Sequence, residues 1–176
     1  MNALGGEIGL FIPGISYHIR ANASNPAYRK APRGLDKNGA FVVNPGIGIV
    51  YDNRNKEDGS SFAWSAMAIT FKDCNDRAAF AVGLGGNYRY YVNKYFSLHG
   101  DLYISAYSAQ DWETAEYHTS LMPFPSIGIN YHLSNMGNLK GITVGMKTTF
   151  SPKNGKHSST GGFNLLFSYL YIGYSF

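Results

Sequence analysis

Apolar residues alternate with small or polar ones along much of the chain, which is the pattern of a β-strand with one apolar face. Between residues 78 and 92, one set of alternate positions reads Phe80, Val82, Leu84, Tyr88 and Tyr90. The positions between them carry mostly alanine, glycine, asparagine and arginine. The same alternation occurs in 97–107, 125–132 and 142–150, with turn-forming residues between the segments. The pattern predicts strands rather than helices.

The number and length of these segments indicate a membrane barrel. The predicted strands lie near 7–20, 41–53, 61–73, 78–92, 95–107, 121–133, 141–151 and 161–176. Bacterial outer-membrane barrels have an even number of strands, each about ten residues long. Small and polar residues on the second face suit a partly polar lumen better than a sandwich core. The sequence therefore predicts one domain, residues 1–176, folded as an all-β, eight-stranded antiparallel up-and-down transmembrane β-barrel.

Composition agrees with this class and excludes others. Charged residues make up only 15% of the chain, against about a quarter in ordinary soluble domains, and aromatic residues reach 15%. No apolar run approaches the roughly 20 residues of a membrane-spanning helix. A single cysteine excludes an intramolecular disulfide and a cysteine-based zinc cage. No metal-binding cluster, phosphate loop or nucleic-acid patch stands out, so we expect no metal, no cofactor and no nucleic acid partner.

The connections between strands assign the two ends of the barrel. Outer-membrane barrels have short periplasmic turns and longer outer loops, and here 21–40 and 108–120 are long whereas 93–94 is minimal. Both termini then face the periplasm. Much of the excess positive charge lies in the first long connection, which is either a solvated loop or a surface for an anionic partner. His18, Asp73 and Cys74 are all placed at the outer rim.

The predicted lumen divides into two halves. Its outer half is expected to be apolar and roomy, and its inner half turns polar at Asn87 and Arg89. The predicted pocket is lined by Met67, Ile69, Phe71, Ala81, Gly83 and Gly85. An acyl chain would fit there. The alternative is that the small residues relieve crowding in a narrow barrel that fills its own lumen.

Prolines fall near the same end of the predicted strands, at Pro13, Pro45, Pro123 and Pro125. A proline cannot donate to the hydrogen-bond ladder of a sheet. In a closed barrel, gaps in the ladder would open lateral passages between lumen and membrane. A proline at the start of a strand is the ordinary alternative for Pro45 and Pro125, whereas Pro13 lies inside its strand.

Several segments resemble the family of outer-membrane lipid A palmitoyltransferases (PagP). They are 9–20 (GLFIPGISYHIR), 66–74 (AMAITFKDC), 83–85 (GLG), 110–112 (QDW) and 121–128 (LMPFPSIG). The resemblance implies an eight-stranded barrel with one acyl chain in its lumen, located in the Gram-negative outer membrane and acting as a monomer at the extracellular face. The implied activity transfers a palmitoyl group from a phospholipid to lipid A, the acceptor in lipopolysaccharide, without cofactor or metal.

The resemblance also implies residue roles. His18 and Asp73 match the family's catalytic residues, and Cys74 stands where the family has a serine. Gly85 matches the glycine that floors the acyl pocket, which favours a deep pocket and a chain near palmitate. Pro13 and Pro45 would flank one lateral opening, and Pro123 or Pro125 the other.

Acyl transfer between oxygens needs a base for the attacking hydroxyl and stabilisation of the oxyanion. His18 is the expected base, with Asp73 orienting its imidazole. Cys74 has two interpretations. As a thiolate it would form a thioester intermediate; as a replacement for serine it would have a supporting role or weaken the site.

Two other functions stay open. One is a catalytically impaired barrel that binds lipid or has a structural role, in which Cys74 marks lost activity. The other is a lipid A deacylase, suggested by His132 and Ser134 in a His-x-Ser motif. Topology disfavours the deacylase, because it places this motif at a periplasmic turn, and Met146 stands where its acid would be expected.

Overall fold

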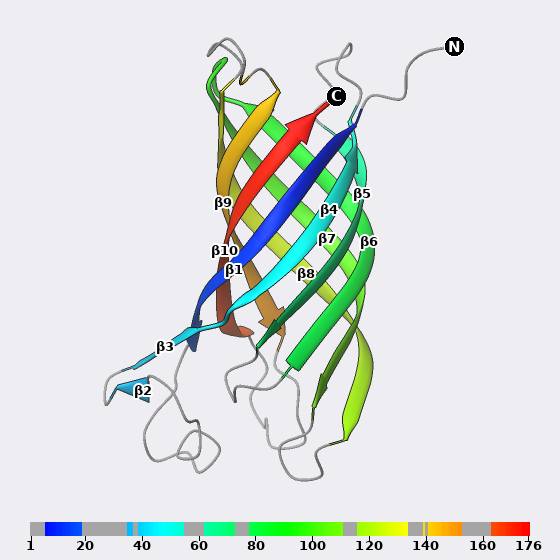
Figure 1. Ribbon diagram of the computed structural model, residues 1–176, viewed down its shortest axis with the longest axis vertical. Coiled ribbons are helices and arrows are strands. Elements are labelled where there is room, and N and C mark those ends of the chain that lie inside the picture. Colours follow the sequence, from blue (N-terminus) through cyan, green and yellow to red (C-terminus); the bar gives the residue numbers. More distant parts are fainter. Residues whose placement is uncertain are drawn as a thin grey trace.

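The computed structural model describes residues 6–18, 35–36, 39–54, 62–72, 78–110, 116–133, 139, 141–152 and 163–176. They form a tall barrel of antiparallel strands (Figure 1). The strands are β1 (Glu7–His18), β2 (Leu35–Asp36), β3 (Gly39–Val43), β4 (Gly46–Asn53), β5 (Phe62–Lys72), β6 (Ala78–Tyr91), β7 (Phe96–Gln110), β8 (Tyr117–His132), β9 (Ile142–Pro152) and β10 (Phe163–Ser175).

Eight of these strands close the barrel, as the alternation predicted. Strands β4 to β10 each pair with the next along the chain, and β1 pairs with both β10 and β4. Strand β3 continues the line of β4 alongside β1, and β2 pairs only with β3. The start of β1 and the end of β10 lie at one end of the barrel, which we call the termini end (Figure 1). The opposite end, where β1 and β5 finish at His18 and Lys72, is the far end.

Two predicted boundaries differ from the structure. The predicted strand 41–53 is divided at residues 44 and 45 into β3 and β4. The predicted long connection 108–120 is much shorter, because β7 and β8 stay paired up to Gln110 and Tyr117. Pro123 and Pro125 therefore lie inside β8. The β7–β8 ladder tolerates them because the missing N–H of each proline faces away from β7.

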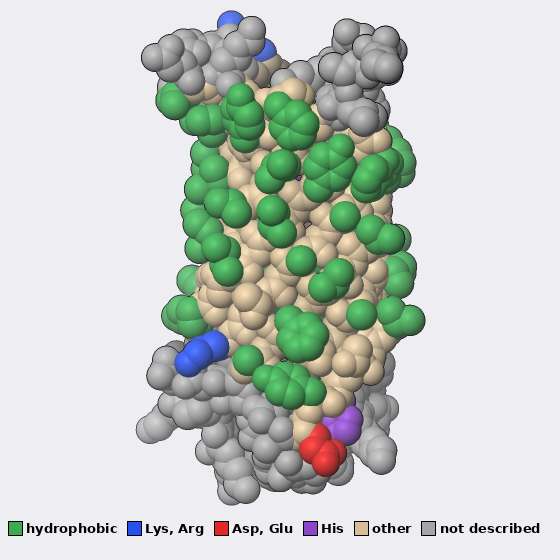
Figure 2. All heavy atoms as spheres, turned by 45° about the vertical axis from the view of Figure 1, so that its right-hand side comes forward, with side chains coloured by type: hydrophobic (Ala, Val, Ile, Leu, Met, Phe, Trp, Pro, Cys, Tyr) green, Lys and Arg blue, Asp and Glu red, His purple; other side chains and the backbone are tan. Residues whose placement is uncertain are grey.

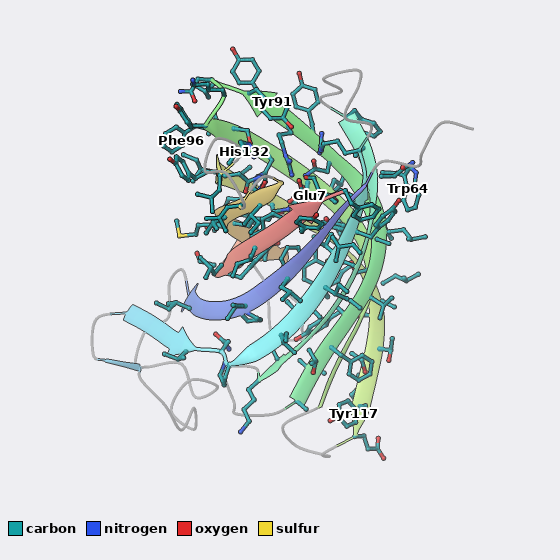
Figure 3. The ribbon with its side chains drawn as sticks, turned by 45° about the horizontal axis from the view of Figure 1, so that its top comes forward. Glu7, Trp64, Tyr91, Phe96, Tyr117 and His132 are labelled. Atoms are coloured by element: carbon teal, nitrogen blue, oxygen red, sulfur yellow. The ribbon has the colours of Figure 1, made fainter. Side chains whose placement is uncertain are left out.

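The outer surface is apolar over the height of the barrel. Figure 2 shows hydrophobic side chains spread over one face, with the charged groups near its two ends. Among the side chains that are described, the exposed Asp, Glu, Lys and Arg residues are Lys72, Lys94 and Glu116, each at or beyond the end of a strand. Trp64 and Phe96 lie on the outside near the termini end and Tyr117 at the far end (Figure 3). This arrangement is typical of an outer-membrane barrel with aromatic residues at both bilayer interfaces.

No helix in the described part of the chain has the length and apolar character needed to cross a membrane.

Candidate functional site

The lumen near the termini end is filled by a buried polar network. Arg89 on β6 donates two hydrogen bonds to Glu7 on β1, of 2.9 and 2.7 Å. The Glu7 carboxylate also accepts from the hydroxyls of Tyr171 and Ser175. Both charged side chains are nearly inaccessible to solvent. Figure 3 shows Glu7 inside the barrel near this end.

A second buried group is centred on Asp101 of β7. Its carboxylate accepts from Lys147 at 3.0 Å, from Ser126 at 2.7 Å and from the side-chain amide of Asn87. Asn87 in turn accepts from Arg54. Among the described residues, the buried acids are Glu7, Asp52 and Asp101 and the buried bases are Arg54, Arg89 and Lys147. The charges balance, which is what burial in a low-dielectric lumen requires.

A compact apolar layer follows toward the far end. Its buried members are Phe11, Val50, Met67, Ala81, Tyr103, Tyr169 and Tyr171. The ring of Phe11 packs on Tyr169 and Tyr171, with centroids 4.7 and 5.7 Å apart. Lys147 approaches the faces of Phe11 and Tyr171 from the polar side, at 5.3 and 4.8 Å. The polar network and the apolar layer together occupy the lumen between the termini end and the far-end side chains described next.

Toward the far end, four apolar side chains border this layer, and we call the part of the lumen that they line the cup. They are Ile69, Phe71, Tyr107 and Phe124, which face inward and pack against the apolar layer but are only half-buried. Phe71 and Phe124 lie on either side of Tyr107, with ring centroids 6.4 and 5.9 Å from it. Their partial exposure contrasts with Met122 and Ala79, which face the lumen toward the same end and are buried.

The structure divides the six predicted pocket residues. Ile69 and Phe71 line the cup, whereas Met67 and Ala81 are buried in the layer beneath it. A side chain at Gly83 would meet the hydroxyl of Ser105, at 2.1 Å from the added carbon.

The pocket is also shallower than a floor at Gly85 implies. Gly85 pairs across the β6–β7 ladder with Tyr103, which is only 1% exposed and occupies the lumen there. Crowding accounts for the small residues of the inner half of the barrel, and the apolar space in the outer half stays a prediction.

The ladder between β1 and β4 is interrupted next to Pro13. Pairing stops at Phe11 and Gly48 and resumes between Ile15 and Val43 of β3. The β1–β10 register shifts at the same place, between Pro13 and Ile15. Pro13 is inward and buried, whereas Ile15 is exposed, so the alternation of β1 changes parity across this bulge. We call this interruption the first seam.

A second seam separates β8 from β9 toward the far end. The ladder ends at Ser126 and Thr149, so residues 117–125 of β8 pair with β7 alone. Pro123 and Pro125 lie in this stretch, with their missing donors on the β9 side. The Thr149 hydroxyl donates to the carbonyl of Pro125 at 2.8 Å, next to the point where the ladder ends. Unpaired backbone donors are costly in a bilayer, and these prolines remove two of them.

The predicted catalytic residues lie partly outside the described residues. His18 is the last residue of β1, and its backbone pairs with Leu165 and Ala40; its side chain is not among those described. Asp73 and Cys74 follow directly after Lys72, the last residue of β5, and both lie outside the described residues. Strands β1 and β5 both neighbour β4, but their ends are staggered, because Lys72 contacts Pro45 whereas His18 pairs with Ala40, five positions earlier in the chain.

The structure adds one residue at this rim that sequence reasoning missed. Asn44, in the break between β3 and β4, is 1% exposed. Its side chain donates to the carbonyl of Lys72 at 2.8 Å, and its backbone N–H donates to the carbonyl of Gly14 at 2.8 Å. The only signal in the sequence is an asparagine directly before a proline, a common turn pair.

His132 belongs to the opposite end of the barrel. It lies inside near the termini end (Figure 3), with Nε2 2.8 Å from the Ser97 hydroxyl and Nδ1 3.0 Å from the Thr143 hydroxyl. Ser134, its partner in the His-x-Ser motif, lies outside the described residues. No group of three or more potential metal-binding His, Cys, Asp or Glu residues occurs among the residues that the structure describes.

Comparison with known proteins identifies the class of fold. No family model and no curated protein matches the chain. Among solved structures, Neisserial surface protein A is similar over 99% of this chain and 98% of its own, with 9% identity and a TM-score of 0.57.

Two further solved structures are similar at lower TM-scores. The N-terminal β-barrel domain of Pseudomonas aeruginosa OprF has 10% identity, 98% coverage of both chains and a TM-score of 0.49. Ail of Yersinia pestis has 12% identity, 97% and 99% coverage and a TM-score of 0.47. The closed sheet of eight strands and the likeness to Neisserial surface protein A give the chain the fold of the eight-stranded outer-membrane barrels, and at 9% identity the likeness concerns the fold alone.

Proposed function

We propose that the protein is an acyltransferase of the Gram-negative outer membrane that moves a long acyl chain from a phospholipid to lipid A. The observation that carries this proposal is the cup, whose four apolar side chains near the far end are only half-buried. At this rim of the barrel, β1 finishes at His18 and β5 finishes one residue before Asp73. An acyl chain in the cup would leave its ester group at this rim.

The outer surface supports placement in a bilayer. Exposed apolar side chains cover the barrel wall, and among the described residues the exposed charged groups lie near the strand ends. We place the far end at the extracellular face, where lipid A resides, and both termini in the periplasm.

The two seams support a route for lipid. A donor phospholipid and a lipid A acceptor both arrive from within the membrane, so their chains must pass the barrel wall. The wall lacks ladder hydrogen bonds beside Pro13, and also between β8 and β9 on the far-end side of Ser126. We assign entry and exit of lipid chains to these seams, and assign Pro13, Pro45, Pro123 and Pro125 to their edges.

The chemistry proposed at the rim is direct transfer. His18 accepts the proton of a lipid A hydroxyl as its oxygen attacks the ester carbonyl of the phospholipid. The carbon–oxygen bond to the glycerol breaks, and the proton passes from His18 to the leaving glycerol oxygen, giving lysophospholipid and acylated lipid A. Asp73 orients the imidazole. Cys74 supports the site, or attacks first and forms a thioester that the acceptor hydroxyl then cleaves.

The filled layer beneath the cup bears on chain length. Tyr103 occupies the lumen at the level of Gly85, and Met67 lies next to it toward the far end. The methyl end of the acyl chain would therefore stop on the far-end side of both residues. We expect chains shorter than palmitoyl to be transferred at least as well as palmitoyl. Met67→Ala should shift the preference toward longer chains, measured with a series of phosphatidylcholine donors of increasing chain length.

The test of the proposal is a transferase assay in detergent micelles. Labelled phosphatidylcholine and lipid A are incubated with the wild type and with His18→Ala, His118→Ala and Cys74→Ser. His118 is an exposed histidine at the far end and serves as the matched control. We expect product from the wild type and from His118→Ala, and a loss of 10²–10⁴-fold in His18→Ala. Equal product from wild type and His18→Ala would exclude the proposed base.

A second candidate is a lipid-binding barrel without turnover, favoured by Cys74 in the place of the resembling family's serine. It predicts lipid that co-purifies with the barrel but no labelled product. Gain of transfer in Cys74→Ser would support this candidate, whereas loss of transfer in Cys74→Ser would make the cysteine a working nucleophile.

A further inference from the structure

A proline interrupts the ladder between β4 and β5 directly before the proposed catalytic segment. Lys72 donates its backbone N–H to the carbonyl of Pro45 at 2.9 Å. In a regular antiparallel sheet, two residues that face each other in this way exchange both hydrogen bonds. The reciprocal bond to the carbonyl of Lys72 cannot form, because residue 45 is a proline and has no N–H.

Asn44 supplies the missing donor from its side chain. The side-chain amide donates to the carbonyl of Lys72 at 2.8 Å. The N–H and the carbonyl of Lys72 that face β4 are therefore both hydrogen-bonded. Asn44 is almost fully buried, so water does not compete for this bond. Its backbone N–H reaches the other way and donates to Gly14, at the bulge of β1 in the first seam.

Asn44 therefore links the two strands that carry the proposed catalytic residues. Gly14 precedes His18 by four residues on β1, and Lys72 directly precedes Asp73. The link crosses the place where the β1–β4 ladder is interrupted, so few other backbone hydrogen bonds hold the two ends together there. Asn44 thus holds the end of β5, one residue before Asp73, to the bulge of β1.

We propose that Asn44 is a positioning residue that fixes the end of β5, and with it Asp73, relative to β1. Its importance for transfer rests on the proposed function, but its structural role can be tested without it. The distinctive feature is that the donor replaces a backbone N–H removed by Pro45. Restoring that N–H should therefore make the side chain dispensable.

The experiment compares wild type, Asn44→Ala, and the double variant Asn44→Ala/Pro45→Ala in detergent micelles. Asn53→Ala, at the other end of β4, is the matched control. The readouts are residue-resolved hydrogen exchange of the Lys72 amide, the alkylation rate of Cys74 and acyl transfer. Cys74 is the only cysteine and lies two residues beyond Lys72, so it reports on this segment in the native sequence.

We expect Asn44→Ala to speed Lys72 exchange and change Cys74 alkylation on the order of tenfold, about the effect of losing one buried hydrogen bond. The double variant should return both rates, and any transfer activity, toward the wild type, and Asn53→Ala should leave all three unchanged. Unchanged rates in Asn44→Ala, or rates that stay altered in the double variant, would overturn the proposal. If the wild type transfers no acyl chain while the exchange and alkylation rates change as expected, the proposed function is excluded. The positioning role of Asn44 would still hold.

Discussion

The guanidinium of Arg89 and the carboxylate of Glu7 form a two-bond ion pair, 2.9 and 2.7 Å long, between β6 and β1. These strands lie on different sides of the lumen, separated by β4 and β5 in the sheet order. The pair therefore crosses the barrel and contributes to closing it at the termini end. Hydroxyls of Tyr171 and Ser175 complete the shell of Glu7.

We predict that removing one partner of this ion pair lowers the free energy of unfolding much more than removing both partners. Arg89→Leu leaves the Glu7 carboxylate buried without its counterion, and such losses cost about 3–5 kcal/mol. The double variant Glu7→Leu/Arg89→Leu replaces both charges by apolar groups and should recover most of that stability. Urea unfolding in micelles measures the difference. A double variant no more stable than Arg89→Leu would contradict this account, and Lys94→Leu, which removes an exposed charge, is the control.

Sequence reasoning predicted the faces of the strands because each depends only on local alternation. Phe80, Val82 and Leu84 are exposed on the outside, and Ala79 and Ala81 are buried inside, as the alternation indicates. The change from apolar to polar along β6 was also predicted, since Asn87 and Arg89 are buried in the polar half. These features need no knowledge of which strand is the neighbour.

The depth of the pocket could not be predicted in this way, because it depends on side chains from other strands. Tyr103 on β7 fills the lumen opposite Gly85, and Tyr171 on β10 fills the space beside Gly9. A glycine in one strand leaves space beside its backbone. Only the pairing register of the neighbouring strands shows which side chain occupies that space. The role of Asn44 is non-local in the same sense, since it depends on Lys72, 28 positions away.

A second prediction concerns the space beside Gly9. A carbon added there would lie 2.1 Å from the ring of Tyr171, which is held in place by its hydrogen bond to Glu7. Gly9→Ala should therefore destabilise the barrel by about 1–3 kcal/mol through overpacking. Gly100→Ala is the matched control, because its nearest neighbour would be 3.9 Å away. Thermal unfolding in micelles compares the two, and equal melting temperatures would show that Tyr171 can move aside.

A third prediction tests whether the apolar wall faces lipid. Leu84 is 67% exposed in the middle of β6, and we expect Leu84→Arg to destabilise the barrel by about 2–4 kcal/mol in phospholipid bilayers. Lys72→Arg, at the end of β5, keeps an existing charge near the interface and should change little. The measurement is the urea midpoint of folding into vesicles. A Leu84→Arg variant that folds into vesicles as well as the wild type would argue against a bilayer at this height.

The last prediction compares two asparagines that are both fully buried in the polar half of the lumen. Asn87 donates to Asp101 and accepts from Arg54, whereas neither side-chain polar atom of Asn130 has a hydrogen-bond partner among the described residues. Asn87→Leu should destabilise the barrel by more than about 1–3 kcal/mol, because charged groups lose a partner.

Asn130→Leu should be neutral or stabilising, since it replaces an unsatisfied buried amide by an apolar group with the same branching. Urea unfolding of both variants in the same micelles decides the matter. A loss of stability in Asn130→Leu equal to that in Asn87→Leu would mean that the Asn130 amide is hydrogen-bonded within the lumen. The polar half would then depend on both asparagines, rather than on the chain from Arg54 through Asn87 to Asp101 and Lys147.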